Sequence, residues 1–283
     1  MKKFLNRLFW SVLALVIIGY GVIIWWFNAH ELELVYSPDR EMRSVPDSLG
    51  LTATRITVVS GDGVKLVGRV YRGPLPDSSA TWILYFHGNA GNASRRVDFH
   101  AQLIRRGFSV LVAEYRGYGE SDGSPGEWGI YDDAETFCAY AHNALGVPPE
   151  HLIFYGHSLG SAVAIELACR RKAAGLILEG AMTSVPDRGQ ELYPYLPVAM
   201  MATNRFDSID KIGRLTLPKL FLHAIDDEII PIAHGRKLFQ AAPLPKTFQE
   251  VHGGHNSAYQ IDRQKFFDAI GEFARSVRKS TGI

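Results

Sequence analysis

The sequence lacks an excess of charge of either sign, because 30 lysines and arginines face 29 aspartates and glutamates and leave a formal net charge of +1. A balanced chain offers no strongly basic surface, so we expect no nucleic-acid partner. Internal repeats and low-complexity stretches are also missing from the sequence. A length of 283 residues then suits one large domain with a sizeable core.

Cysteine is scarce, with only Cys138 and Cys169 in the chain. Both lie among apolar neighbours in segments that we predict to be helical, so we interpret each as a small buried hydrophobe. A disulfide between them stays open as an alternative for a domain outside the cytoplasm.

A long apolar run stands at the N-terminus, where no residue from Leu8 to Ala29 is formally charged. About 20 apolar residues are enough for a helix to span a bilayer, so residues 1–30 are predicted to form one transmembrane anchor. Trp10 near the start of the run, and Trp25 and Trp26 near its end, suit the two membrane–water interfaces.

The charges that flank this run predict its orientation. Basic residues precede it and acidic residues follow it, namely Lys2, Lys3 and Arg7, then Glu31 and Glu33. Because basic residues favour the cytoplasmic side, we expect a cytoplasmic N-terminus and a body on the exterior or periplasmic side. A cleaved signal peptide is the alternative, although the run is longer than the apolar core of such peptides and no Ala-x-Ala-like site follows Phe27.

The rest of the chain divides into a connector and a body. Residues 31–54 include Pro38 and Pro46 and are predicted to be irregular. The body, residues 55–283, begins with two strands joined by a Gly-rich turn, and apolar strands then alternate with helices. This rhythm predicts an α/β fold with a mostly parallel, doubly wound sheet and helices on both faces. The expected strands are 55–59, 64–71, 82–86, 108–115, 152–156, 175–179, 219–224 and 247–251.

The stretch Gly156-His157-Ser158-Leu159-Gly160 lies between a short apolar run and a small-residue helical run. A Gly-x-Ser-x-Gly at a strand-to-helix junction is typical of a nucleophile elbow, in which the serine sits on a strained tight turn. Glycine is needed at the two flanking positions because a side chain there would collide with the neighbouring strand and helix. We therefore predict Ser158 as a nucleophile.

A serine hydroxyl needs a base, and the base needs an acid that fixes its tautomer. In a doubly wound sheet these groups follow later strands, in the order serine, acid, histidine. Asp227 comes just after the 219–224 strand and is our candidate acid. Its neighbours Asp226 and Glu228 are alternatives, and Glu179, which ends the preceding strand, is a weaker one.

The candidate base is His255, in the sequence His252-Gly253-Gly254-His255 after the last strand. The two glycines allow a sharp loop that would bring the imidazole of His255 toward Ser158. His252 leaves the strand too early for this role. A metal site made of His252 and His255 is conceivable, but no third group of ligands accompanies them, so we expect no metal.

An oxyanion formed by attack on a carbonyl group needs two N–H donors. We expect the first from the backbone of Leu159 and the second from Asn89, in the loop after the 82–86 strand. His157 is interpreted as a residue that packs beside the sheet, and His87 as a brace of its loop. Tyr118 either borders the pocket or forms part of a hydrogen-bonded loop.

Residues 181–217 lie between two core strands and are rich in Pro, Tyr and Met, including Tyr193-Pro194-Tyr195-Leu196-Pro197. We interpret this segment as a small lid. Its methionine, tyrosine and leucine side chains suit an acyl pocket, because thioethers adapt to varied chains. Ordinary packing over the sheet edge explains them equally well.

These pieces together resemble the α/β-hydrolase superfamily, specifically its small-lid, serine-aminopeptidase-like branch, which includes membrane-anchored acyl-protein thioesterases and lysophospholipases. The resemblance runs from about Arg55 to the C-terminal helix. It rests on the motifs His87–Asn92, Tyr115–Gly119 and Gly156–Gly160, and on Asp227 paired with Gly254-His255. It implies the α/β-hydrolase fold and triad hydrolysis, but it does not select a substrate.

We therefore expect a membrane-anchored serine hydrolase that acts on carboxylic esters or thioesters, with small-molecule or lipid-derived acyl substrates and with no cofactor. Ser158, Asp227 and His255 would form the catalytic triad, and Asn89 and Leu159 the oxyanion hole. A peptidase or amidase of the same fold is one alternative. A non-catalytic binding protein that retains the fold is another.

Overall fold

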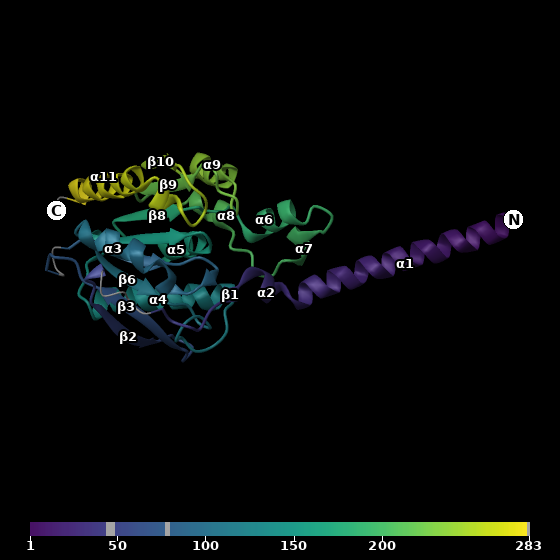
Figure 1. Cartoon of the computed structure of the whole chain (residues 1–283), viewed down its shortest axis with the longest axis horizontal. Helices are drawn as coiled ribbons and strands as arrows, with labels where there is room; N and C mark the ends of the chain where they lie inside the picture. The colour runs from purple at the N-terminus through teal and green to yellow at the C-terminus, as the bar shows by residue number, and fades with distance from the viewer. Residues whose placement is uncertain (44–48, 77–79, 282–283) are drawn as a thin grey trace.

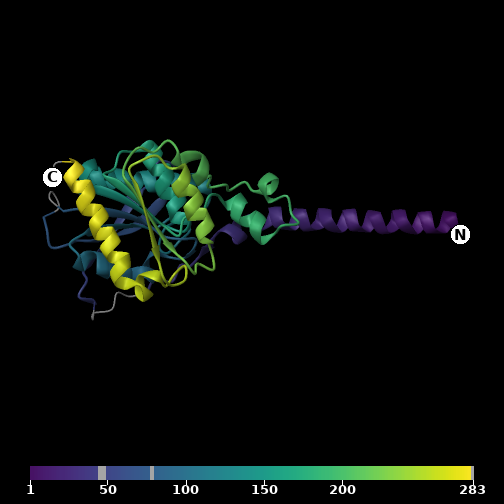
Figure 2. The same ribbon diagram turned by 90° about the horizontal axis from the view of Figure 1, so that it is seen from above.

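The computed structural model describes residues 1–43, 49–76 and 80–281, and shows a long N-terminal helix that projects from a sheet-centred body (Figure 1). The view from above shows the same arrangement, with the two chain ends on opposite sides of the molecule (Figure 2). The helices are α1 (Lys2–Ala29), α2 (Glu31–Val35), α3 (Val97–Arg105), α4 (Glu127–Asn143), α5 (Leu159–Arg170), α6 (Val185–Leu192), α7 (Val198–Met201), α8 (Ser208–Ile212), α9 (Ile232–Ala241), α10 (Ala258–Ile261) and α11 (Arg263–Thr281), with 3-10 turns η2 (Ala93–Arg96) and η3 (Pro149–His151).

An eight-stranded sheet forms the centre of the body, in the strand order β10-β9-β8-β7-β4-β6-β3-β2. Its strands are β2 (Ala53–Val59), β3 (Lys65–Tyr71), β4 (Trp82–Phe86), β6 (Ser109–Ala113), β7 (Leu152–His157), β8 (Gly175–Glu179), β9 (Lys219–Ala224) and β10 (Lys246–Val251). The pairs β2–β3 and β3–β6 are antiparallel, and every other pair in this sheet is parallel. The predicted hairpin followed by parallel strands is therefore confirmed.

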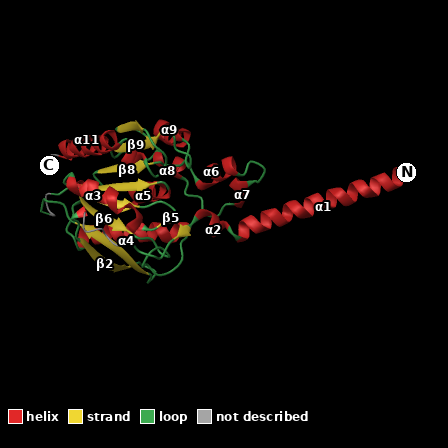
Figure 3. Cartoon of the chain, in the orientation of Figure 1, coloured by secondary structure: helices red, strands yellow, loops and turns green. Residues whose placement is uncertain are grey.

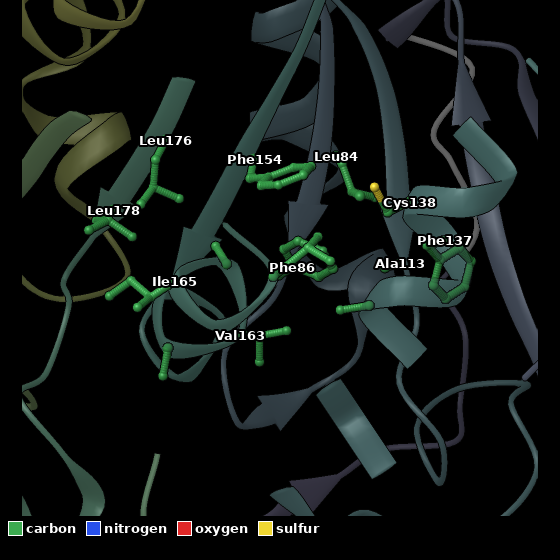
Figure 4. Packing of buried hydrophobic residues seen from close by; sticks show 14 of the residues in the cluster. Leu84, Phe86, Ala113, Phe137, Cys138, Phe154, Val163, Ile165, Leu176 and Leu178 are labelled. Atoms are coloured by element: carbon green, nitrogen blue, oxygen red, sulfur yellow. The ribbon is translucent and has the colours of Figure 1, made fainter. Parts of the chain in front are cut away.

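Side chains that alternate along the strands divide the interior into two cores, one on each face of the sheet. Leu84 and Phe154 belong to the core under α4 and α5, while their neighbours Tyr85 and Tyr155 belong to the core under α3 and α11. Figure 4 shows the first of these cores, where Phe86, Phe154 and Val163 lie close together. Helices lie on both faces of the sheet (Figure 3), and strands in such a position are expected to be apolar throughout. Strands β4, β6, β7, β8 and β9 are buried at every residue.

Helix α1 is the one segment of the described chain that is long and apolar enough to cross a membrane, and none of it is buried in the body. By length and composition alone, a signal sequence near an N-terminus has the same properties. Its C-terminal end meets α2, and α6 and α7 of the 181–217 segment lie beside this junction (Figures 1 and 2).

Two expectations from the sequence are corrected here. The 31–54 connector is not irregular throughout, because it forms α2 and a two-residue strand, β1 (Ser37–Pro38), which pairs with β5 (Ala90–Gly91). Pro46 lies outside the described residues. Both cysteines are free thiols, and Cys138 is buried as expected, but Cys169 is exposed on α5. Residue 169 is helical as predicted, and it lies on the outer face of the helix.

Candidate active site

Ser158 sits at the sharp turn between β7 and α5. Its φ of 54° lies in the left-handed region, which is uncommon for a residue with a side chain. The turn leaves no space at the flanking glycines, because a Cβ on Gly156 would lie 2.2 Å from the carbonyl oxygen of Gly160, and one on Gly160 would lie 2.2 Å from that of Phe86. The backbone N–H of Ser158 donates to the carbonyl of Glu179 at 2.8 Å and ties the turn to β8.

Asp227 and His255 meet although they follow different strands, β9 and β10. Nδ1 of His255 donates to Oδ2 of Asp227 at 2.7 Å. The other carboxylate oxygen, Oδ1, accepts the N–H groups of Ile229 at 3.0 Å and Ile230 at 2.7 Å. The carboxylate is thus held on both sides, and it fixes the proton of His255 on Nδ1.

The environment of the pair favours an ionised acid. Burial raises the pKa of Asp227, but the hydrogen bond and charge of His255 and the N–H of Ile230 outweigh it, so that its pKa lies below the usual value. Beside the pair, the ring of His157 lies 4.9 Å from that of His255. Burial, with the charge of Arg96, lowers the pKa of His157 well below its usual value, so this ring is neutral.

The alternative acids and base lie elsewhere. Asp226 is exposed, and Glu228 accepts the backbone N–H of His255 at 3.1 Å and does not contact its ring. Glu179 is engaged by Arg96 through two hydrogen bonds of 2.7 and 2.9 Å. His252 is exposed, and its backbone N–H donates to Asp262. Among the described residues, no three His, Cys, Asp or Glu side chains form a group that could hold a metal ion.

The loop after β4 places Asn89 beside Ser158, and two tyrosine side chains hold this loop in position. The Tyr115 hydroxyl donates to the carbonyl of His87 at 2.9 Å, and the Tyr118 hydroxyl donates to the carbonyl of Asn89 at 2.7 Å. Tyr118 is fully buried and is therefore part of this bracing and not of a pocket wall. Nε2 of His87 lies 3.0 Å from the carboxylate of Glu114, as expected for a brace of the loop.

Two cavities meet at Ser158 and Asn89. One, of about 410 Å³, is mostly apolar and lies between the α1–α2 junction and the 181–217 segment. The other, of about 590 Å³, is more polar, and both His255 and His157 line it. Among the described residues, no hydrogen bond occupies the hydroxyl of Ser158 or Nε2 of His255, so both are available to a bound molecule.

Comparisons with known proteins agree with this architecture. The family model described as "Serine aminopeptidase, S33" matches residues 77–209. An uncharacterized protein of Mycobacterium tuberculosis is 32% identical over 264 residues, which cover 93% of this chain and 92% of that protein. Alpha/beta hydrolase domain-containing protein 17B of Homo sapiens is 33% identical over 181 residues, or 62% of this chain and 60% of that protein. This chain belongs to the α/β-hydrolase superfamily.

A solved structure supports the same fold. An esterase of Pyrococcus furiosus superposes with a TM-score of 0.69 at 16% identity, over 85% of this chain and 98% of the esterase. At this level of identity the likeness shows the fold, and the resemblance to the α/β-hydrolase superfamily inferred from the four motifs is confirmed.

Some residues around the hydrolase site had no clear signal in the sequence. Arg96, Tyr85 and Tyr155 form a cluster with Glu179 at the polar cavity, which Arg96 lines. Only Glu179 could have been noticed, as a charged residue at the end of a buried strand. Gly180 is a second case: its φ is +56°, and a Cβ there would lie 2.9 Å from Cε1 of His255, so a side chain would displace the imidazole.

Proposed function

We propose that this hydrolase is a membrane-anchored serine enzyme that cleaves carboxylic esters or thioesters through an acyl-enzyme on Ser158. One observation carries the proposal. The Asp227–His255 pair, joined at 2.7 Å, opens onto the same cavity as Ser158, which sits on a turn with the strained φ of a nucleophile elbow.

The proposed reaction has two stages, acylation of Ser158 and hydrolysis of the acyl-enzyme. Oγ of Ser158 would attack the acyl carbon while its proton moves to Nε2 of His255, and Asp227 would stabilise the imidazolium. His255 then gives this proton to the leaving oxygen or sulfur, whose bond to the acyl carbon breaks. In the second stage a water loses its proton to His255 and attacks the acyl-enzyme, and the proton returns to Ser158 as the acid leaves.

The negative oxygen formed in each stage needs donors that are already in place. We propose the backbone N–H groups of Leu159 and Asn89. Leu159 is the first residue of α5, and the first N–H groups of a helix have no partner within it. Asn89 lines both cavities next to Ser158, and its carbonyl is held by Tyr118, which fixes the peptide. This scheme requires no metal and no organic cofactor.

Esters and thioesters are favoured over peptides by the state of the acidic groups near Ser158. A peptidase that trims free amino termini needs a carboxylate to bind the amine. Glu31 and Glu228 line the apolar cavity, but Glu31 accepts the N–H groups of Thr203 and Asn204, and Glu228 accepts that of His255. Both oxygens of Glu31 thus have partners within the chain, whereas Glu228 accepts through Oε2 alone and is the one carboxylate of the two with a free oxygen among the described contacts.

Residues 1–30 are proposed as the anchor, with the N-terminus cytoplasmic and the hydrolase domain outside, and residues 181–217 as a small lid. The basic residues before α1 support this orientation. Protease treatment of spheroplasts, in which the inner membrane is closed but its outer surface is accessible, tests it, because an exterior or periplasmic domain is digested without lysis. Digestion only after lysis would place the domain in the cytoplasm.

Labelling with a fluorophosphonate probe tests the activity. Wild-type protein should be labelled and should hydrolyse p-nitrophenyl esters or an acyl thioester, whereas Ser158→Ala abolishes both and His255→Ala reduces both by at least about a thousandfold. Ser124→Ala, which alters an exposed serine, is the matched control. A folded wild type without labelling would favour the binding-protein alternative, and faster turnover of an aminoacyl p-nitroanilide than of any ester would favour the peptidase.

A further inference from the structure

The end of the membrane helix forms part of the apolar cavity at Ser158. We infer that this cavity holds the acyl chain of the substrate and that the chain reaches Ser158 from the bilayer side, between α1–α2 and the 181–217 segment. The inference rests on the proposed serine-hydrolase function and goes further, because it makes the anchor a determinant of acyl-chain preference.

The position of His255 decides which cavity takes which part of the substrate. The leaving group must lie on the side of His255, because Nε2 of this residue delivers its proton. His255 lines the polar cavity and is not among the residues that line the apolar one. Three arginines, Arg43, Arg95 and Arg96, also line the polar cavity, which suits a polar leaving group. The acyl chain is thereby assigned to the apolar cavity.

Two separate parts of the chain supply the apolar walls. The N-terminal part contributes Phe27, Leu34 and Val35, and the 181–217 segment contributes Leu192, Val198 and Met201. The cavity volume of about 410 Å³ lies within the usual range for small ligands. Without the N-terminal part, this cavity would lose one of its walls.

Specific contacts hold the two walls together. The Glu31 carboxylate accepts the backbone N–H of Thr203 at 2.7 Å and that of Asn204 at 2.8 Å. The rings of Phe27 and Tyr193 pack edge to face with their centres 4.8 Å apart. Helices α1 and α2 and the 181–217 segment therefore form one continuous unit around the cavity.

The depth of the cavity relative to the membrane follows from the helix geometry. Trp25 and Trp26 are expected at the outer interface. Helix α1 ends at Ala29, three residues or about 5 Å beyond Trp26, and α2 begins at Glu31. The 181–217 segment also exposes apolar side chains next to α1, with Tyr195 89% and Met200 88% exposed. The Tyr20 hydroxyl, within the apolar run, donates to the carbonyl of Tyr195 at 2.8 Å. Tyr20 precedes Trp25 by five residues of α1, or about 8 Å, so the Tyr195 end of the segment lies on the membrane side of the interface. The outer wall of the cavity thus extends from the bilayer surface into the outer leaflet.

A pair of variants on α2 tests the inference in the full chain, reconstituted in phosphatidylcholine vesicles. Leu34→Trp adds bulk to the cavity wall, whereas Leu32→Trp adds the same bulk to an exposed position of the same helix that does not line the cavity. We measure kcat/KM for p-nitrophenyl decanoate and acetate. Leu34→Trp should lower the decanoate-to-acetate ratio by about tenfold, as expected when about two methylene groups lose their place. Leu32→Trp should leave the ratio unchanged.

A second pair addresses the contact between the walls. Glu31→Gln weakens the hydrogen bonds to the 203–204 backbone, and Glu33→Gln removes an exposed carboxylate from the same helix. We expect Glu31→Gln to raise KM for decanoate several-fold with a smaller change in kcat, and Glu33→Gln to change neither. An unchanged ratio in Leu34→Trp, or equal effects in the matched controls, would overturn the inference while the esterase proposal stands. A wild type that is neither labelled by the fluorophosphonate nor active on either ester or on an acyl thioester would instead overturn the proposed function.

Discussion

Arg96 and Glu179 form a two-point ion pair inside the protein, with both guanidinium–carboxylate distances below 3.0 Å. The Tyr155 hydroxyl donates to the same carboxylate at 2.9 Å. Glu179 ends β8, and its backbone carbonyl accepts the N–H of Ser158, so this pair supports the strand that holds the elbow.

Loss of one partner of this pair should be costly, because it leaves the other charge buried. Arg96→Met is expected to lower the free energy of unfolding by about 3–5 kcal/mol. The double variant Arg96→Met/Glu179→Met should recover part of this loss, since no charge is then left unpaired. Denaturant unfolding in detergent measures both values, and a double variant less stable than the single one would contradict the prediction.

Asp227→Asn should leave the fold intact and remove most of the activity. An amide can present an N–H to Nδ1 of His255 and so stabilise the wrong tautomer, which is expected to lower kcat about ten-thousandfold. Asp226→Asn, at the exposed neighbouring position, is the control. Comparable losses in both variants would assign the role of acid to the loop as a whole and not to Asp227.

The lowered pKa of Asp227 leads to a prediction for the pH dependence of stability and activity. The folded-state pKa of Asp227 is below its usual value of 3.8. Its ionised form therefore stabilises the fold above that value, and the contribution is lost only as the pH falls through the lower, folded pKa. The pH profile of kcat/KM should consequently show no limb from Asp227 between about pH 5 and pH 9. The infrared band of a protonated carboxyl group reports Asp227 directly, and such a band above pH 5 that is absent in Asp227→Asn would refute this.

Gly160→Ala should damage the elbow directly. The new Cβ would lie 2.2 Å from the carbonyl oxygen of Phe86, a backbone atom of β4 that cannot rotate away. We expect a loss of stability of about 1–3 kcal/mol and slower fluorophosphonate labelling. Gly61→Ala is the control, because no described atom lies within 4 Å of a Cβ there. Normal labelling of Gly160→Ala would show that the elbow relaxes without loss of geometry.

Lys219 is expected to make the free energy of unfolding depend on pH in the alkaline range. Its buried ammonium group donates to the carbonyls of Leu215 and Leu217, both at 2.7 Å. Burial and the nearby Lys246 lower the pKa of Lys219 to about 8. Between this pH and about 10.4 the unfolded chain binds a proton that the folded chain has lost, so this group makes stability rise with pH.

The comparison with Lys219→Met isolates this effect from the titration of other groups. The difference in the free energy of unfolding, wild type minus variant, should increase between about pH 8 and pH 10. Denaturant titrations in buffers across this range measure it. A difference that stays constant or falls would show that Lys219 keeps its ordinary pKa.

The sheet and the elbow could be predicted because their signals are local. Runs such as Trp82–Phe86 are apolar at every position, which only a strand covered on both faces requires. The two glycines around Ser158 mark the turn by their spacing, although only Gly156 is required by a contact within the motif, whereas Gly160 is required by the backbone of Phe86 on β4. The fold was predictable for these reasons, and so was the placement of Asp227 and His255 on loops at the same edge of the sheet.

The cavity walls could not be predicted, because they depend on contacts between distant segments. Glu31 and Thr203 are 172 residues apart, and no periodicity in either segment indicates the other. The pairing of Arg96 with Glu179 could not be predicted for the same reason, because the two residues are 83 positions apart in the sequence. Cys169 shows a simpler limit, since its apolar neighbours indicated a helix but not which side of it faces solvent.

The short pairing of β1 with β5 changes where a water-soluble version of this protein should begin. The hydrolase pattern in the sequence starts near residue 55, but Ser37 donates its N–H to the carbonyl of Asn89, and the Asn89 side chain donates to the carbonyl of Val35. A clone that starts at 55 would remove these partners from the loop beside Ser158. A protein that starts at Glu31 keeps them and loses α1, including Phe27 of the cavity wall. The end of the membrane segment and the start of the folding unit are therefore two different boundaries.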